Sequence, residues 1–199
     1  MSGGYELRLA EPSDSAWLAR AALDAGGGLY EHLLVDALGD AAAEAALAAA
    51  LADGEAALSW RNAIVATGSN GDAVGAAIAY PAARFGLAKT IRAAASTTAL
   101  ADLAALFATV PPERSHYLHA IWSAPEVRGA GVGGLLLDAV VAVGNDLGAE
   151  SVSLHVWADN GAALKLYRSR GFRVVEKIDI PGRRRMRHDG GKFLMAAAI

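Results

Sequence analysis

Short runs in which apolar and polar residues alternate recur along the chain, and each run predicts a β-strand. The clearest is residues 151–157, in which Val152, Leu154 and Val156 fall on one face. Residues 68–72, which contain Gly, Asn and Asp, separate two such runs and predict a hairpin turn. In chain order, strands are predicted over residues 5–9, 57–66, 73–80, 116–122, 151–157, 172–178 and 192–199.

Helical spacing of apolar residues fills most of the intervals between these strands. Helices are predicted over residues 15–25, 41–52, 131–147 and 160–170, whereas residues 29–38 are ambiguous. Residues 81–114 are Ala-rich and carry two consecutive prolines near their end, which predicts a helical insertion between the third and fourth strands. Because this insertion has few large apolar residues for a core of its own, we expect a single α/β domain over residues 1–199.

Composition excludes several kinds of chemistry. The chain has 199 residues, a formal net charge of −3 and no cysteine, which rules out a disulfide scaffold and a cysteine nucleophile. The slightly negative charge gives no electrostatic drive toward nucleic acid or an anionic membrane. Residues 1–6 show neither the basic nor the apolar region of a signal peptide, so we expect none, and no apolar run reaches about 18 residues. We therefore expect a cytoplasmic protein with no nucleic-acid or membrane partner.

Residues 125–134, P-E-V-R-G-A-G-V-G-G, follow a predicted strand and open a predicted helix. Glycines let the backbone approach a ligand, and the free N–H groups at a helix start attract anions, so this loop is a candidate pyrophosphate site. A dinucleotide loop would use Gly129, Gly131 and Gly134, but the loop lies late in the chain and lacks the acidic residue that should end a second strand. The G-K-[ST] of a Walker loop is absent. The R-x-x-G-x-G pattern is present, and a glycine turn without a ligand remains an alternative.

The segment that follows distinguishes these readings. Residues 156–172, V-W-A-D-N-G-A-A-L-K-L-Y-R-S-R-G-F, resemble the strand–Asn–helix–Tyr–Gly–Phe signature of the GCN5-related N-acetyltransferase (GNAT) family. Residues 117–125 resemble the family's fourth strand with its following Pro, and residues 7–14 resemble its first strand and helix entry. The resemblance does not extend to residues 81–114. It implies a mixed, mostly antiparallel sheet of about seven strands, helices on both faces, and a splay between strands 4 and 5.

The resemblance also implies an acetyl-CoA-dependent N-acetyltransferase and assigns roles to residues. Backbone groups of Ile121 and Ser123 would hold the pantetheine arm and polarise the thioester, although the family usually has a small aliphatic residue where this chain has Ser123. Asn160 would bind the same arm, and Tyr167 would be the general acid for the leaving thiolate. A core aromatic with a hydrogen-bonded hydroxyl is the alternative for Tyr167. The pyrophosphate would lie on backbone N–H groups of Arg128, Gly129, Ala130, Gly131, Val132, Gly133 and Gly134.

A general base must also take a proton from the acceptor amine. His119 is the first candidate because its ordinary pKa suits neutral pH and it lies on the strand before the loop. A hydrogen-bonded structural histidine is the alternative for His119, and His155 is a second candidate for the base. Strict alternation places Tyr117, His119 and Ile121 on one face, and His116, Leu118, Ala120 and Trp122 on the other, so His119 and His116 face one pocket only if a β-bulge intervenes. No histidine pair has metal-ligand spacing, so we expect no metal.

The acceptor is expected to be a small-molecule or peptide amine, attacked directly in a ternary complex because no cysteine can carry the acyl group. Tyr30, Glu31, His32 and Tyr117 are candidate substrate-binding residues. Residues 183–187 contain four arginines, which could attract an acidic acceptor or a cofactor phosphate, or form a solvated hairpin. A non-catalytic acyl-CoA-binding module and a DNA-associated modifier are the competing functions. A homodimer is compatible with the resemblance.

Overall fold

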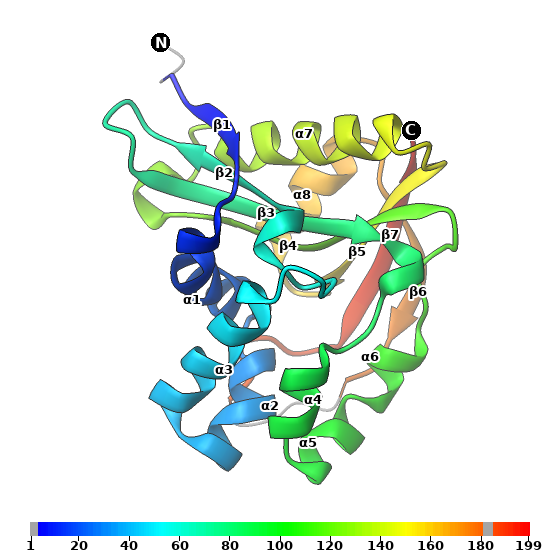
Figure 1. Cartoon of the computed structure of the whole chain (residues 1–199). Helices are drawn as coiled ribbons and strands as arrows, with labels where there is room; N and C mark the ends of the chain where they lie inside the picture. The colour runs from blue at the N-terminus through cyan, green and yellow to red at the C-terminus, as the bar shows by residue number, and fades with distance from the viewer. Residues whose placement is uncertain (1–3, 181–184) are drawn as a thin grey trace.

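The computed structural model describes residues 4–180 and 185–199, and it contains a seven-stranded sheet in the order β1-β2-β3-β4-β5-β7-β6 (Figure 1). The strands are β1 (Glu6–Leu9), β2 (Ala63–Thr67), β3 (Ala73–Pro81), β4 (Ser115–Ser123), β5 (Ser151–Trp157), β6 (Arg173–Ile178) and β7 (Lys192–Ala198). Neighbouring strands are antiparallel except for β4 and β5, which are parallel. The predicted mixed, mostly antiparallel sheet is confirmed.

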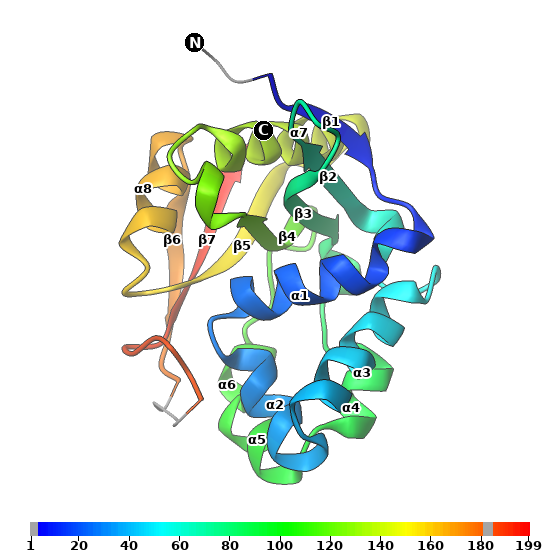
Figure 2. The same cartoon turned by 90° about the vertical axis from the view of Figure 1, so that its left-hand side faces the viewer.

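Helices cover both faces of this sheet. The helix α7 (Val132–Asp146) lies across one face, and α1 (Ser15–Gly26) lies across the other (Figures 1 and 2). Leu136, Leu137 and Val140 of α7 are fully buried against the sheet. In the described residues, no helix combines the length and apolar character needed to cross a membrane.

A group of helices extends beyond α1, away from the sheet (Figure 2). It consists of α2 (Leu29–Leu38), α3 (Asp40–Ala52), α4 (Lys89–Ala94), α5 (Thr97–Asp102) and α6 (Ala104–Ala108). The last three occupy the predicted insertion. Two large apolar residues of the insertion, Ile91 and Leu103, are fully buried in one cluster with Leu33 and Leu47 of α2 and α3. The insertion therefore shares a core with the N-terminal helices, which explains how so Ala-rich a segment is held in place.

Two local predictions need correction. The strand predicted to begin at residue 57 begins at Ala63, because the Ser59 side chain accepts a hydrogen bond from the Arg61 N–H and caps a 3₁₀ turn there. The strict alternation predicted for β4 is also wrong. Ala120 pairs with Ile78 and Leu118 with Ala79, so His119 is an extra residue, a β-bulge.

The bulge changes which β4 side chains share a face. Trp122 lies on the same face as His119 and donates from Nε1 to Asp24 of α1 over 2.7 Å. Ala120 lies on this face as well, because it borders a small gap beside Leu18 and Ala22 of α1. Ile121, by contrast, packs with the α7 cluster on the opposite face. Because one inserted residue reverses the alternation beyond it, Ile121 and His119 point away from each other.

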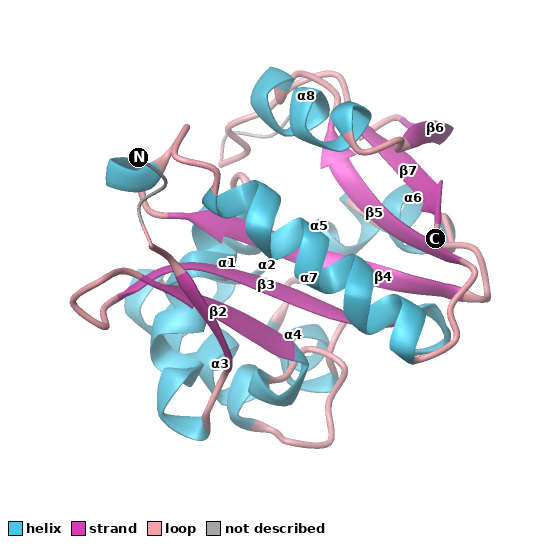
Figure 3. Cartoon of the chain, turned by 90° about the horizontal axis from the view of Figure 1, so that it is seen from above, coloured by secondary structure: helices cyan, strands magenta, loops and turns pink. Residues whose placement is uncertain are grey.

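The predicted splay between β4 and β5 is confirmed. The two strands pair only between Ser115–Leu118 and Ser151–Leu154. β5 continues to pair with β7 as far as Trp157, and β4 continues to pair with β3 as far as Ser123. The two strands move apart toward their carboxyl ends (Figure 3). The facing backbone edges there have no recorded strand partner in the described chain, and they leave room for an extended ligand.

Candidate active site

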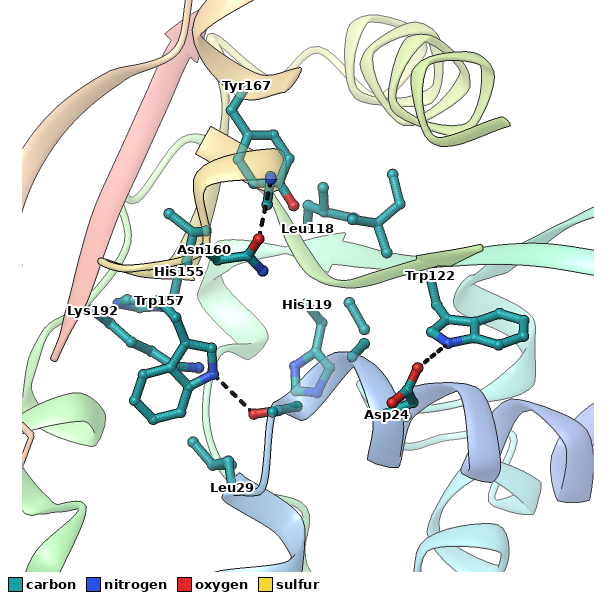
Figure 4. A pocket seen from close by; sticks show the side chains of 18 of the residues that line it. Asp24, Leu29, Leu118, His119, Trp122, His155, Trp157, Asn160, Tyr167 and Lys192 are labelled. Atoms are coloured by element: carbon teal, nitrogen blue, oxygen red, sulfur yellow. Dashed lines mark hydrogen bonds between the residues drawn. The ribbon is translucent and has the colours of Figure 1, made fainter. Parts of the chain in front are cut away.

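A cavity of about 850 Å³ lies where β4 and β5 separate (Figure 4). Its lining comes from β4, β5, the β4–α7 loop, the α1–α2 junction and α8 (Gly161–Ser169). The structure brings together these predicted residues at its wall: Tyr30, Tyr117, His119, Ile121, Ser123, Arg128, Gly129, Gly133, Gly134, Asn160 and Tyr167. It does not place Glu31, His32, Ala130, Gly131 or Val132 among the lining residues.

The β4–α7 loop presents unpaired backbone donors at one end of this cavity. Gly129 and Gly131 have φ values of 82° and 93°, a conformation that no non-glycine residue of the described chain adopts. The N–H groups of Arg128 and Ala130 already donate within the loop, to Pro125 and Val127. The N–H groups with no recorded partner in the described chain are those of Gly129, Gly131, Val132, Gly133 and Gly134. Free donors at the start of a helix form an anion site.

The helix α8 places two side chains in the cavity. The Asn160 Oδ1 atom accepts a hydrogen bond from the Ala163 N–H over 3.2 Å and caps the helix, which leaves the amide nitrogen of Asn160 for a ligand. Tyr167, seven residues on, is 5% exposed, and its hydroxyl points toward Leu118 and the middle of the cavity (Figure 4). Burial raises the pKa of Tyr167, so its hydroxyl remains a proton donor at neutral pH.

His119 lies between two tyrosine hydroxyl groups. Its Nε2 atom is 2.5 Å from the Tyr30 hydroxyl and its Nδ1 atom is 2.8 Å from the Tyr80 hydroxyl. In the neutral ring one nitrogen donates and the other accepts, so one tyrosine donates to His119 and the other accepts from it. Burial, and secondarily the charge of Lys192, lower the pKa of His119 to about 4, which keeps the ring neutral at pH 7.

A second pair lies beside the first. The Tyr117 hydroxyl is 2.9 Å from Nδ1 of His155. Burial lowers the pKa of His155 to about 3, and its Nε2 atom is buried with no partner in the described chain. Phe85, which follows β3, packs against both rings, at centroid distances of 4.9 Å and 5.5 Å. The insertion side of the fold therefore closes one wall of the cavity.

Of the substrate-binding residues predicted in the α1–α2 region, one lines the cavity and two form contacts elsewhere in the fold. Tyr30 reaches the cavity, whereas His32 lies 3.1 Å from Asp102 and links α2 to α5. Glu31 lies 3.5 Å from Arg187, which also donates to Asp24 over 2.9 Å. Among the predicted arginine run, residues 183 and 184 lie outside the described residues. Arg187 lines the cavity, but its guanidinium is bound to α1.

Sequence reasoning missed several residues of this site, among them Tyr80, Trp157 and Lys192. Tyr80 pairs with Tyr117 across β3 and β4, a contact that becomes visible only once the register is known. Trp157 donates from Nε1 to the Gly26 carbonyl over 3.0 Å and fixes the α1–α2 junction to β5. Across the part of the chain that the structure describes, no three His, Cys, Asp or Glu side chains are grouped to hold a metal ion.

Comparison with known proteins agrees with this geometry. Residues 31–172 match the model of the acetyltransferase (GNAT) family. Among curated protein sequences, none matches this chain.

Solved structures share the fold. One described as an acetyltransferase has 24% sequence identity and a TM-score of 0.70, over 97% of this chain and 98% of that one. An N-acetyltransferase from Staphylococcus aureus Mu50 has 18% identity and a TM-score of 0.71, over 96% and 100%. The PaiA N-acetyltransferase from Thermoplasma acidophilum in complex with coenzyme A has 16% identity and a TM-score of 0.56, over 98% and 99%.

Proposed function

The chain belongs to the acetyltransferase (GNAT) family, an acyl-CoA-dependent N-acetyltransferase family, and from that premise we propose that it transfers an acetyl group from acetyl-CoA to a primary amine. The observation that carries this proposal is the cavity between the separated ends of β4 and β5. Unpaired loop N–H groups lie at one end of the cavity, and the Tyr167 hydroxyl points into its middle. A long, partly peptide-like thioester with a pyrophosphate at its far end fits this arrangement, as the coenzyme A bound to the Thermoplasma relative suggests.

The cofactor is held mainly by backbone in this proposal. The free N–H groups of Gly129 and residues 131–134 bind the pyrophosphate, with Arg128 adding a charged donor beside them. The pantetheine arm takes the place of the missing β4–β5 pairing and bonds the backbone of Ile121 and Ser123. The amide nitrogen of Asn160 donates to the same arm.

The reaction is a direct attack. The amine nitrogen bonds to the thioester carbonyl carbon, and the oxyanion that forms is stabilised by β4 backbone N–H groups. The carbon–sulfur bond then breaks, and Tyr167 gives its proton to the departing sulfur. The nitrogen loses its proton to neutral His119 through the Tyr30 hydroxyl, which lies 2.5 Å from Nε2. No acyl-enzyme is needed, in keeping with the absence of cysteine.

We further propose that residues 1–199 act as one acetyltransferase domain. The 81–114 insertion supplies part of the acceptor end, because Phe85, Leu106 and Phe107 line the cavity. The acceptor is a small-molecule or peptide amine that enters past these residues and the α1–α2 junction.

Calorimetric titration with acetyl-CoA, CoA and NAD tests the cofactor. We expect both CoA species to bind and NAD not to bind. In the matched variant Gly133→Val the new Cβ lies no closer than 3.4 Å to the protein, so the variant folds but its side chain blocks the phosphates and binding is lost. Preferential NAD binding, or unchanged acetyl-CoA affinity in this variant, would refute the loop assignment.

A thiol-release screen of amines with acetyl-CoA tests turnover. Release that depends on an amine is expected, together with the acetylated amine in equal amount. Tight acetyl-CoA binding without release for any amine would instead identify the non-catalytic acyl-CoA-binding module.

A further inference from the structure

Lys192, the first residue of β7, has no role in the reaction described above. The residue is 9% exposed and lines the cavity. Its Nζ atom lies 4.6 Å from the centre of the Trp157 ring, beside which Figure 4 shows its side chain. Within the described chain no carboxylate forms an ion pair with it. A buried ammonium without a counter-charge is unfavourable, and a ligand can supply that charge.

The other charges of the cavity do not neutralise Lys192. The charged lining residues in the described chain are Asp24, Arg128, Lys165, Arg187 and Lys192. Asp24 is the single carboxylate among them, and it already accepts from Trp122, Arg187 and Arg128 at 2.7 Å, 2.9 Å and 3.3 Å. The wall therefore has an excess of positive charge and no unengaged carboxylate to hold a second ammonium of a polycationic acceptor.

Lys192 lies at the acceptor end. It pairs with Trp157 across β5 and β7, and Trp157 is hydrogen bonded to the α1–α2 junction. Its charge acts on both His119 and His155, so the ammonium is within electrostatic reach of the group that we propose takes the amine's proton. Arg128, by contrast, lies at the loop that we assign to the pyrophosphate.

We propose that Lys192 binds a carboxylate of the acceptor, and that the acceptor is a small amine carrying a carboxylate in the same molecule, as an amino acid does. This inference rests on the proposed acetyl transfer. A small acceptor is favoured over a peptide because one cavity of about 850 Å³ must also hold the cofactor arm. Its remaining wall, which includes Phe85, Phe107 and Trp157, is aromatic and suits the acceptor's apolar part.

The test compares each carboxylate-bearing amine with the same amine lacking the carboxylate. Thiol release with acetyl-CoA is measured for phenylalanine and phenethylamine, lysine and cadaverine, β-alanine and ethylamine, and 4-aminobutyrate and propylamine. A short peptide with an acidic first residue is added as a separate arm. The variants are Lys192→Met and Lys192→Gln, and the matched control is Lys177→Met, which removes an exposed lysine on neighbouring β6.

We expect the wild type to prefer the carboxylate-bearing member of at least one pair by on the order of 100-fold in kcat/KM. Both Lys192 variants should abolish this preference through KM while retaining acetyl-CoA affinity. Lys177→Met should leave the preference unchanged. Because Met is apolar and of similar length, we expect Lys192→Met to fold, and a melting curve with an acetyl-CoA titration checks it.

The outcomes separate the two proposals. Thiol release that treats both members of every pair alike, or that prefers the peptide, refutes the inference and leaves acetyl transfer standing. The same holds if a carboxylate preference survives in both Lys192 variants. Acetyl-CoA binding without thiol release for any amine refutes acetyl transfer, and the inference fails with it.

Discussion

Replacing Tyr167 with phenylalanine removes one oxygen atom from the centre of the cavity. The ring is 5% exposed and packs against Phe172 at a centroid distance of 5.7 Å, and both contacts persist in Tyr167→Phe. The hydroxyl has no hydrogen-bond partner in the described chain, so its removal leaves no buried polar group without a partner. We expect the free energy of unfolding to change by about 1 kcal/mol or less.

The effect on the reaction should be much larger. Burial raises the pKa of Tyr167, so the hydroxyl carries its proton throughout the neutral range. A positioned general acid contributes roughly 10²- to 10⁴-fold to a rate, which corresponds to about 3–5 kcal/mol of the activation barrier. Because no contact with the phosphates is lost, acetyl-CoA affinity should be unchanged. The fall should therefore be in kcat.

Steady-state thiol release and calorimetric acetyl-CoA titration measure these two quantities on the same preparation. Tyr5→Phe is the matched control, since Tyr5 packs at the edge of the α7 cluster and does not line the cavity. A Tyr167→Phe enzyme with wild-type kcat would refute the general-acid assignment. A parallel loss of acetyl-CoA affinity would show instead that the hydroxyl acts in binding.

Two further predictions concern stability. The folded-state pKa of His119 is about 4 and the ordinary value is 6.5, so the unfolded chain binds a proton that the folded chain resists. The contribution of this group to the free energy of unfolding is fully present above about pH 6.5 and is lost as the pH falls toward about 4. At about pH 5 the loss is about 2 kcal/mol. His119→Gln should reduce the acid-induced fall in the urea-derived free energy of unfolding; an identical fall in the variant would contradict the buried neutral ring. Leu103→Ala should cost about 3 kcal/mol in the same assay, because Leu103 is fully buried between the insertion and α2–α3, and an unaltered midpoint would mean that the insertion does not share their core.

Local signals predicted a large part of this fold. The alternation over residues 151–157 fixed β5 at its observed bounds, and glycines with positive φ marked the loop before α7. Asn160 and Tyr167 were predicted from the resemblance of residues 156–172 to the GNAT signature, and the structure places both at the cavity wall. The helices of the insertion were harder to delimit, since alanine favours a helix without indicating which face is buried.

The rest of the site depends on contacts between residues far apart in the sequence. The position of the extra residue in β4 depends on the pairing with β3, and the sequence pattern of β4 alone does not indicate it. That one residue brings His119 into contact with Tyr30 and Tyr80, which are 89 and 39 residues away. It also turns Trp122 onto Asp24, the carboxylate that holds Arg187 beside the acceptor end. The bulge thus connects the proposed base, the cofactor strand and the wall of the acceptor site. A change that removed it, such as deletion of one β4 residue, would separate all three while leaving the glycine loop and the segment with Asn160 and Tyr167 intact.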